Sequence, residues 1–314
     1  MASIWPTAEQ THVRKPLAGY VMVLAAATLF GVNGSVAKVA LSSGLSSLRL
    51  TEARCAGACL GLMLIALARD PRSLRIRRDE LLRLALFGVV GVALVQLFYF
   101  LAIHRLNIGI ALLIQYLGPL LVAIYARTFG HERVRRRIWA ALALSLTGLA
   151  LMVELWKGVA LDGLGVAFAL ISAVIFAMYL LLAEYEVKYR DSVTLMAWGF
   201  LFATIFWTIA QPWWSFPAGR VARTVSLQGQ LASWHLPVWA LVLWVVVLGS
   251  IVPFSLIVGA LRHVTATRVG IAAMLEPVVA TVVAWAWLRE TLSAVQLAGA
   301  AVVLTAILLA QTAR

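Results

Sequence analysis

Charged residues are scarce in this chain. They make up 12% of its 314 residues, about half of the roughly 25% that a water-soluble domain carries. Because 63% of the residues are hydrophobic, a soluble globular domain and a nucleic-acid-binding protein are both excluded, and an integral membrane protein remains. The chain has only two cysteines, which excludes a disulfide scaffold.

Signatures of an enzyme are also missing from the sequence. It holds neither a nucleotide-binding P-loop nor an HExxH zinc motif. Its five histidines are scattered without the spacing of metal ligands, and no acidic cluster suits a metal-dependent lipid transferase. We therefore predict that the protein is not an enzyme and that it uses no cofactor and no metal.

Long apolar runs are what the sequence has in abundance. A membrane-spanning helix needs about 20 mostly apolar residues, and several of these runs are apolar almost all round, which favours helices over alternating barrel strands. The predicted fold is all-α, an integral membrane protein with ten transmembrane helices. They are expected at residues 18–40, 46–68, 82–103, 107–127, 138–154, 163–183, 193–211, 237–259, 267–288 and 292–311.

The basic residues fall mainly on one side of these predicted spans. With the N-terminus inside, eighteen of the 26 Lys and Arg residues lie in cytoplasmic segments and five lie in external loops. Lys and Arg are retained on the cytoplasmic side of a membrane, so we predict a multi-pass inner-membrane protein with both termini in the cytoplasm. The positive net charge then reflects topology, and we expect no nucleic-acid partner.

The two halves of the chain are related to each other. A shift of 158 residues places Pro119 on Pro277 and Glu132 on Glu290, and the first spans of each half align with a shift of 146. Five spans per half is an odd number, so the second half must be inverted relative to the first. Inverted repeats are typical of transporters that alternate access around a central site; the alternative is an old duplication kept for folding alone.

These observations divide the chain into four segments. The predicted boundaries are a cytoplasmic tail at residues 1–17, a first five-helix repeat at 18–154, a linker at 155–162 and a second five-helix repeat at 163–311.

Two prolines interrupt the fourth and ninth predicted spans. Pro119 and Pro277 each remove one backbone hydrogen bond, which frees the carbonyl four residues earlier, at Gln115 and Ala273. In a bundle core such carbonyls can bind a substrate or a water molecule, whereas the alternative is an ordinary kink that shapes packing. We predict that both prolines mark helix breaks or gating positions.

Glu276 lies in the middle of the ninth span, beside Pro277. An unpaired carboxylate at that depth is costly, so it must be paired, protonated or in contact with water. It could bind an amine, carry a proton or hold a gate, or it could form a structural ion pair or hydrogen bond. We predict that it faces a polar cavity.

Other side chains with polar tips lie at similar depth. Aromatic residues in spans often serve packing alone, but as substrate-binding candidates beside Glu276 we name Asn33, Tyr99, Gln115, Tyr116 and Tyr179. Two charged residues in or near spans, Lys38 and Arg54, complete the candidates; Lys38 could instead reach the membrane surface along its aliphatic stem.

Helical spacing near the second span predicts two further contacts. Arg49 and Glu52 are three residues apart and could pair on one helix face. Gly57 and Gly61 form a GxxxG pattern, which favours a close approach to another helix.

The sequence resembles the EamA-type carriers of the drug/metabolite transporter superfamily over about residues 17–311. The segments that carry the resemblance are Leu29–Ser35 with Ala37-Lys38, Ala53-Arg54, Gly130-His131-Glu132-Arg133 with Trp139, and Leu275–Ala280 with Glu290 and Gln296–Gly299. The first segment has Phe30 where the family usually has Trp. The resemblance implies ten helices in two inverted repeats, export of small metabolites such as amino acids, and a central cavity lined by the first, third, fourth, sixth, eighth and ninth spans.

We interpret the chain as a secondary transporter or facilitator that exports small organic metabolites by alternating access, with amino acids or related amphiphilic solutes as the leading substrates. The alternatives are a nucleotide-sugar or lipid-linked solute carrier, for which only Lys38 and Arg54 could meet phosphates, a membrane-embedded enzyme, and a non-transporting sensor. The expected partners are a small-molecule substrate and the lipid bilayer. Proton coupling is open at this stage, as is the choice between monomer and homodimer.

Overall fold

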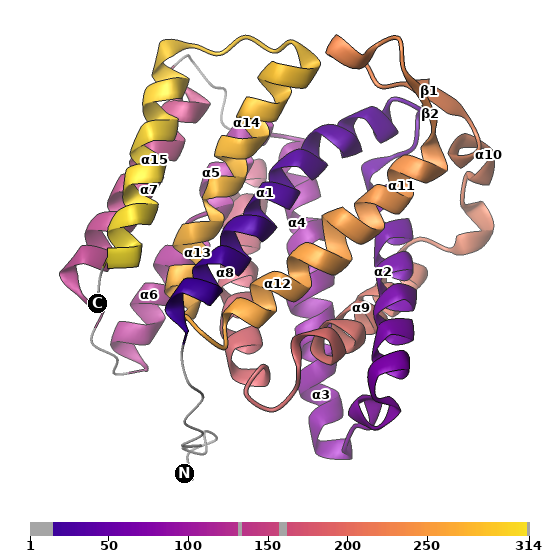
Figure 1. Cartoon of the computed structure of the whole chain (residues 1–314), viewed down its shortest axis with the longest axis horizontal. Helices are drawn as coiled ribbons and strands as arrows, with labels where there is room; N and C mark the ends of the chain where they lie inside the picture. Colours follow the sequence, from indigo (N-terminus) through magenta and orange to yellow (C-terminus); the bar gives the residue numbers. More distant parts are fainter. Residues whose placement is uncertain (1–14, 131–133, 157–161, 313–314) are drawn as a thin grey trace.

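A computed structural model describes residues 15–130, 134–156 and 162–312 of the chain. Within them, ten helical segments are long and apolar enough to cross a membrane, as the sequence predicts. Their axes run side by side in one bundle (Figure 1). Residues 1–14 of the predicted tail and residues 157–161 of the predicted linker lie outside the described residues, as does Glu132, one half of a predicted repeat pair.

The first repeat supplies five spans. They are α1 (Pro16–Leu41), α2 (Ser47–Arg69), the third span α3–η2–α4 (Arg78–Leu86, Phe87–Leu94 and Val95–Ile103), the fourth span α5–α6 (Ile108–Gln115 and Gly118–Thr128) and α7 (Arg136–Val153), with a short 3-10 turn η1 (Pro71–Leu74) after α2.

The second repeat supplies the other five. They are α8 (Gly163–Glu186), α9 (Ser192–Ala210), the eighth span α11–η5–α12 (Val238–Val246, Val247–Ile251 and Val252–Ala260), the ninth span α13–α14 (Ala266–Ala273 and Leu275–Leu288) and α15 (Ala294–Thr312).

The connection between α9 and α11 carries most of the described helices and strands that do not span the membrane. It holds η3 (Trp213–Ser215), α10 (Ala218–Val221), η4 (Gly229–Leu231) and a two-stranded antiparallel hairpin of β1 (Thr224–Ser226) and β2 (His235–Pro237). Residues 212–236 lie between two predicted spans, and the sequence predicts no strand there, because strands of three residues are too short to produce a periodic pattern.

The two repeats share their irregularities as well as their helices. The third and eighth spans each contain a π-helical stretch, η2 and η5, and the fourth and ninth spans are each broken in two, at Tyr116 and at Met274. Tyr116 and Met274 are 158 residues apart, the spacing that relates the two prolines. Such defects cost helix hydrogen bonds and are frequent at functional sites. Because they recur at corresponding places in both repeats, these four spans are where we look for the functional site.

Helices of the two repeats pack against one another in pairs. α2 lies against α9, α7 against α15, and α1 against α14 and α12, while α8 lies against α4 and α6. In Figure 1, α7 and α15 form one edge of the bundle, α2 and α9 lie toward the other, and the broken ninth span lies between them. Glycine permits a further close approach, between α2 and the eighth span, at Gly57 and Gly61, where a Cβ atom would lie 2.7 Å from Val246 and 2.6 Å from Ile251. This confirms the predicted close contact.

The connecting segments separate into two groups at opposite ends of the bundle. At the end where α1 begins and α15 ends, which we call the basic end, Arg190 donates to the carbonyls of Ser73 and Arg75 and pairs with Glu80, 2.6 Å away. Arg262 donates to the carbonyl of Arg190 there. The segments that the charge pattern assigns to one side of the membrane are therefore bonded to each other.

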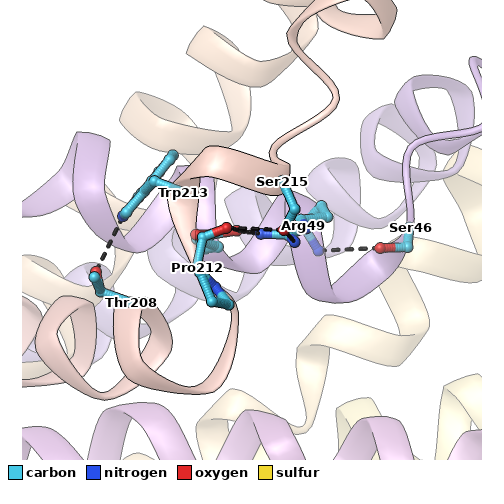
Figure 2. A network of polar contacts seen from close by, with 7 residues as sticks. Ser46, Arg49, Thr208, Pro212, Trp213 and Ser215 are labelled. Carbon is cyan, nitrogen blue, oxygen red and sulfur yellow. Dashed lines mark hydrogen bonds and ion pairs between the residues drawn. The ribbon is translucent and has the colours of Figure 1, made fainter.

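The other end carries the β-hairpin, and we call it the hairpin end. Arg49 pairs there with Glu52 at 2.7 Å, confirming the predicted pair, and also donates to the carbonyl of Pro212 and to Ser215 Oγ, 2.5 Å away (Figure 2). Ser46 caps α2 by accepting from the backbone N–H of Arg49. This network fastens the start of α2 to the segment after α9.

Candidate functional site

Glu276 lies two residues after the break in the ninth span, at the start of α14. Its Oε2 atom is 3.1 Å from the hydroxyl of Tyr116, which lies at the break in the fourth span. The two helix breaks, one from each repeat, therefore bring their side chains into contact in the middle of the bundle.

The hydroxyl of Tyr116 also donates to the carbonyl of Ala273, 3.1 Å away. This is the carbonyl that Pro277 frees from helix hydrogen bonding. A tyrosine hydroxyl has one hydrogen to donate, and here it faces two acceptors. If the Glu276 carboxyl carries a proton, it can donate to the Tyr116 oxygen while the hydroxyl donates to Ala273; without that proton, one acceptor loses its partner.

Arg54, on α2, supplies a positive charge near this pair. Its guanidinium carbon lies 5.9 Å from the centre of the Phe254 ring on α12, a cation–π distance, and its charge interacts with that of Glu276. Its Nε atom is buried and has no hydrogen-bond partner among the described residues. The middle of the bundle therefore holds both signs of charge.

Aromatic rings join Arg54 to Tyr116. Phe254 makes edge contacts with the rings of Phe30, Tyr179 and Phe200, at centroid distances of 5.1, 6.2 and 5.4 Å. Phe176 stacks near Tyr179 at 6.4 Å and meets the edge of Tyr116 at 6.1 Å. We call Arg54, Tyr99, Tyr116 and Glu276, with Phe176, Tyr179 and Phe254, the central cluster.

Tyr99 and Tyr179 differ in how they join this cluster. Tyr99, on α4, is half-buried and is close enough to Glu276 for an electrostatic interaction. Tyr179, on α8, is buried, and its hydroxyl has no hydrogen-bond partner in the described part of the chain. Its ring stacks at 5.7 Å on Phe87, in the π-helical stretch of the third span.

Two predicted residues lie outside the cluster. Gln115 donates to Ser172 Oγ at 2.9 Å, and Ser172 donates to the carbonyl of Val95 at 3.1 Å, a chain that joins α5, α8 and α4. Asn33 packs against Gly249 in the π-helical stretch of the eighth span, where an added Cβ would lie 2.1 Å from the Asn33 oxygen. That buried oxygen has no partner among the described residues.

Lys38 and Pro119 have different surroundings again. Lys38 is 2.7 Å from Glu290 at the hairpin end, with 60% and 50% of the two side chains exposed, so it lies away from the central cluster. At the same end the Arg105 guanidinium donates a hydrogen bond to the Asp162 carboxylate, 3.0 Å away. This hydrogen bond lowers the pKa of the Asp162 carboxyl. Pro119 packs on α13, where a Cβ at Gly270 would lie 2.6 Å from the proline ring.

Sequence reasoning missed Phe254 and Ser172. A phenylalanine or a serine inside an apolar span carries no periodic signal, and the importance of both depends on side chains that are distant in sequence. Phe176 had a signal, because the shift of 146 residues places it on Phe30. Among the described residues no group of histidine, cysteine, aspartate and glutamate could hold a metal ion.

Comparison with known sequences identifies the family. The pattern of the EamA-like transporter family matches residues 17–154 and again residues 163–312. The chain belongs to this family. The two matched stretches correspond to the two repeats, and the family's members are transporters rather than enzymes.

Individual EamA-like relatives agree with this assignment. The threonine/homoserine exporter RhtA of Escherichia coli strain K12 is 28% identical over 255 residues, covering 81% of this chain and 76% of the exporter. An uncharacterized transporter of Archaeoglobus fulgidus is 27% identical, covering 73% of this chain and 75% of its own. These relatives indicate a multi-pass inner-membrane protein with a small-molecule substrate.

A solved structure has the same fold. A crystallised protein superposes with a TM-score of 0.74 at 18% identity, covering 94% of this chain and 96% of its own.

Proposed function

We propose that this chain exports amino acids or closely related small amphiphilic metabolites, and that they bind at the central cluster. The observation that carries this proposal is the presence of Arg54 and Glu276 together, in aromatic surroundings in the middle of the bundle. An amino acid has a carboxylate for the arginine, an ammonium group for the glutamate and a small side chain for the rings. Relatives named as threonine/homoserine exporters support the same substrate class.

The proposed mechanism is alternating access by rocking of the two inverted repeats about this cluster. Both broken spans contribute to it, Tyr116 from one repeat and Glu276 from the other. A relative movement of the repeats would therefore change the surroundings of a bound solute directly.

Glu276 also gives the proposal a way to couple transport to protons. The Tyr116 hydroxyl can satisfy Ala273 and Glu276 together only when the carboxyl brings its own hydrogen. A solute's ammonium group could replace that proton, so that the carboxyl carries a proton in one direction and a solute in the other. The groups that act on this carboxyl are Arg54, Tyr99 and Tyr116.

Flux from proteoliposomes tests the proposal. Vesicles loaded with a mixed pool of amino acids and small metabolites should lose a few solutes selectively, as followed by mass spectrometry. Glu276→Gln should reduce this loss at least tenfold at unchanged protein yield, whereas Glu290→Gln, which alters an exposed carboxylate at the hairpin end, should not. Loss of no solute by folded wild-type protein would contradict amino-acid export.

A further inference from the structure

A hollow lies at the basic end, away from the central cluster. It is a cavity of about 350 Å³ between α6, α8 and α13, lined among others by Val122, Tyr125, Ala126, Glu184, Lys188 and Thr267. Val122 and Thr267 are buried, at 1% and 6% exposure, whereas Lys188 is exposed. The cavity therefore has a closed floor and an open mouth, and it is large enough for a molecule of amino-acid size.

The cavity carries both signs of charge beside apolar surface. The Glu184 carboxylate accepts a hydrogen bond from the backbone N–H of Ala266, 3.1 Å away at the start of α13, and this bond fixes its position on the wall. The rings of Tyr125 and Tyr185 line the same space, and the ammonium group of Lys188 lies at its mouth. This arrangement fits a zwitterion with a small apolar part.

One layer of close packing separates the cavity from the central cluster. α6 and α13 run in opposite directions past each other, so their residues form successive pairs about one helical turn apart. Val122 and Thr267 line the cavity floor, Pro119 and Gly270 touch in the next layer, and the hydroxyl of Tyr116 reaches Ala273 in the layer after that.

The middle layer is tightly closed. A Cβ atom at Gly270 would lie 2.6 Å from Pro119 Cγ and 3.4 Å from Leu180 Cδ1, which leaves no space for a solute between them. All three residues are buried. A solute in the cavity and a solute at the central cluster would thus be separated by a single layer of side chains.

We propose that this cavity is a second solute site, which receives a zwitterion at the basic end before the Pro119–Gly270–Leu180 layer opens to the central cluster. Glu184 holds the ammonium group and Lys188 meets the carboxylate. The identity of the solute rests on the proposed function, but the site itself does not depend on Glu276. The same chemistry is offered by the headgroup of an ethanolamine lipid, so the experiment must distinguish these two sources.

Protection of an introduced cysteine tests the site. Cys55 and Cys59 are buried, so wild-type protein should give a low background with a membrane-impermeant thiol reagent. Ala126→Cys should react from the basic end, and L-threonine should slow this reaction at least threefold in vesicles of phosphatidylcholine and phosphatidylglycerol. Ala284→Cys is the matched control, because it occupies the corresponding position of α14, 158 residues later, and its reaction from the basic end should be slow and unaffected.

Combined variants separate this site from the central cluster. Protection of Ala126→Cys should persist with Glu276→Gln and disappear with Glu184→Gln. Protection that disappears with Glu276→Gln, or that is absent in every background, would overturn the proposal. Protection without L-threonine in vesicles that contain phosphatidylethanolamine would assign the cavity to a lipid headgroup. If protection persists while wild-type protein exports nothing, the site stands and the proposed function fails.

The intervening layer has its own test. Gly270→Ala places a methyl group against Pro119 and should disfavour the closed layer, so Ala273→Cys should react at least threefold faster from the basic end. Gly148→Ala is the control, because its Cβ would lie 2.7 Å from Val303 in the contact between α7 and α15, at the edge of the bundle. An equal increase with both variants would mean general loosening and would overturn the layer's role.

Discussion

The fourth and ninth spans are broken at corresponding positions of the backbone, but they carry different side chains there. Under the shift of 158 residues, Gly118-Pro119 in the first repeat corresponds to Glu276-Pro277 in the second. A Cβ atom at Gly118 would lie 2.7 Å from the ring of Phe176 and 3.1 Å from the carbonyl of Ala173, both on α8. The first repeat therefore has no room for a side chain where the second carries a carboxylate.

This difference shows how a duplicated fold can form one asymmetric site. The first break contributes a donor, the Tyr116 hydroxyl, and the second contributes both acceptors, the Ala273 carbonyl and the Glu276 carboxylate. Symmetry supplies two helix breaks that meet at mid-bundle, and divergence at a few positions gives each break a different role. Changes to the second break should therefore affect transport most, and changes remote from both breaks should affect it least.

Glu276→Gln should have the largest effect. The amide can still accept a hydrogen bond from Tyr116, but it cannot exchange a proton or balance an ammonium charge. We expect solute efflux to fall at least tenfold and its response to an imposed pH gradient to disappear. Efflux that keeps the wild-type response to the gradient would show that proton exchange occurs elsewhere.

Gly118→Ala changes the first break without altering any polar group. The added methyl group must displace Phe176 or the α8 backbone, and overpacking of this kind costs about 1–3 kcal/mol. We expect a lower melting temperature in detergent and a several-fold loss of efflux, because Phe176 contacts Tyr116. Wild-type stability in this variant would show that α8 yields easily at this contact.

Tyr116→Phe removes the donor that joins the two breaks. One such hydrogen bond contributes about 0.5–1.5 kcal/mol, and about 1.4 kcal/mol is tenfold in a rate, so we expect up to roughly tenfold less efflux. The double variant with Glu276→Gln should be scarcely worse than Glu276→Gln alone, since the two groups act together. Strictly additive losses would indicate that Tyr116 acts only by packing.

The sequence was a good guide to the parts of this fold that repeat with a period. Ten apolar windows predicted ten spans. The breaks in the fourth and ninth spans lie three residues before Pro119 and Pro277, because a missing N–H has a local effect on the helix. The π-helical stretches escaped prediction. They depend on packing between helices, as at Gly249, which approaches Asn33.

The candidate site was less predictable for a related reason. The sequence shows how deep in a span a residue lies, but it does not show toward which neighbouring helix the side chain of that residue points. Glu276, Tyr116 and Tyr99 come together in the structure, whereas Gln115 turns to Ser172 although it is adjacent to Tyr116. The prediction that these residues bind substrate stays a prediction, which the flux experiments test.

Charge pairs at the hairpin end should show the smallest effect on transport. Lys38 and Glu290 are 60% and 50% exposed, and exposed pairs contribute about 0–1 kcal/mol. Lys38→Gln should therefore leave efflux within about twofold of wild type and the melting temperature nearly unchanged. Arg49→Gln is the useful contrast, because it leaves Glu52, which is 1% exposed, without its ion-pair partner and should cost about 3–5 kcal/mol of stability. A large loss of efflux with Lys38→Gln at normal stability would instead mean that this pair closes the hairpin end during transport.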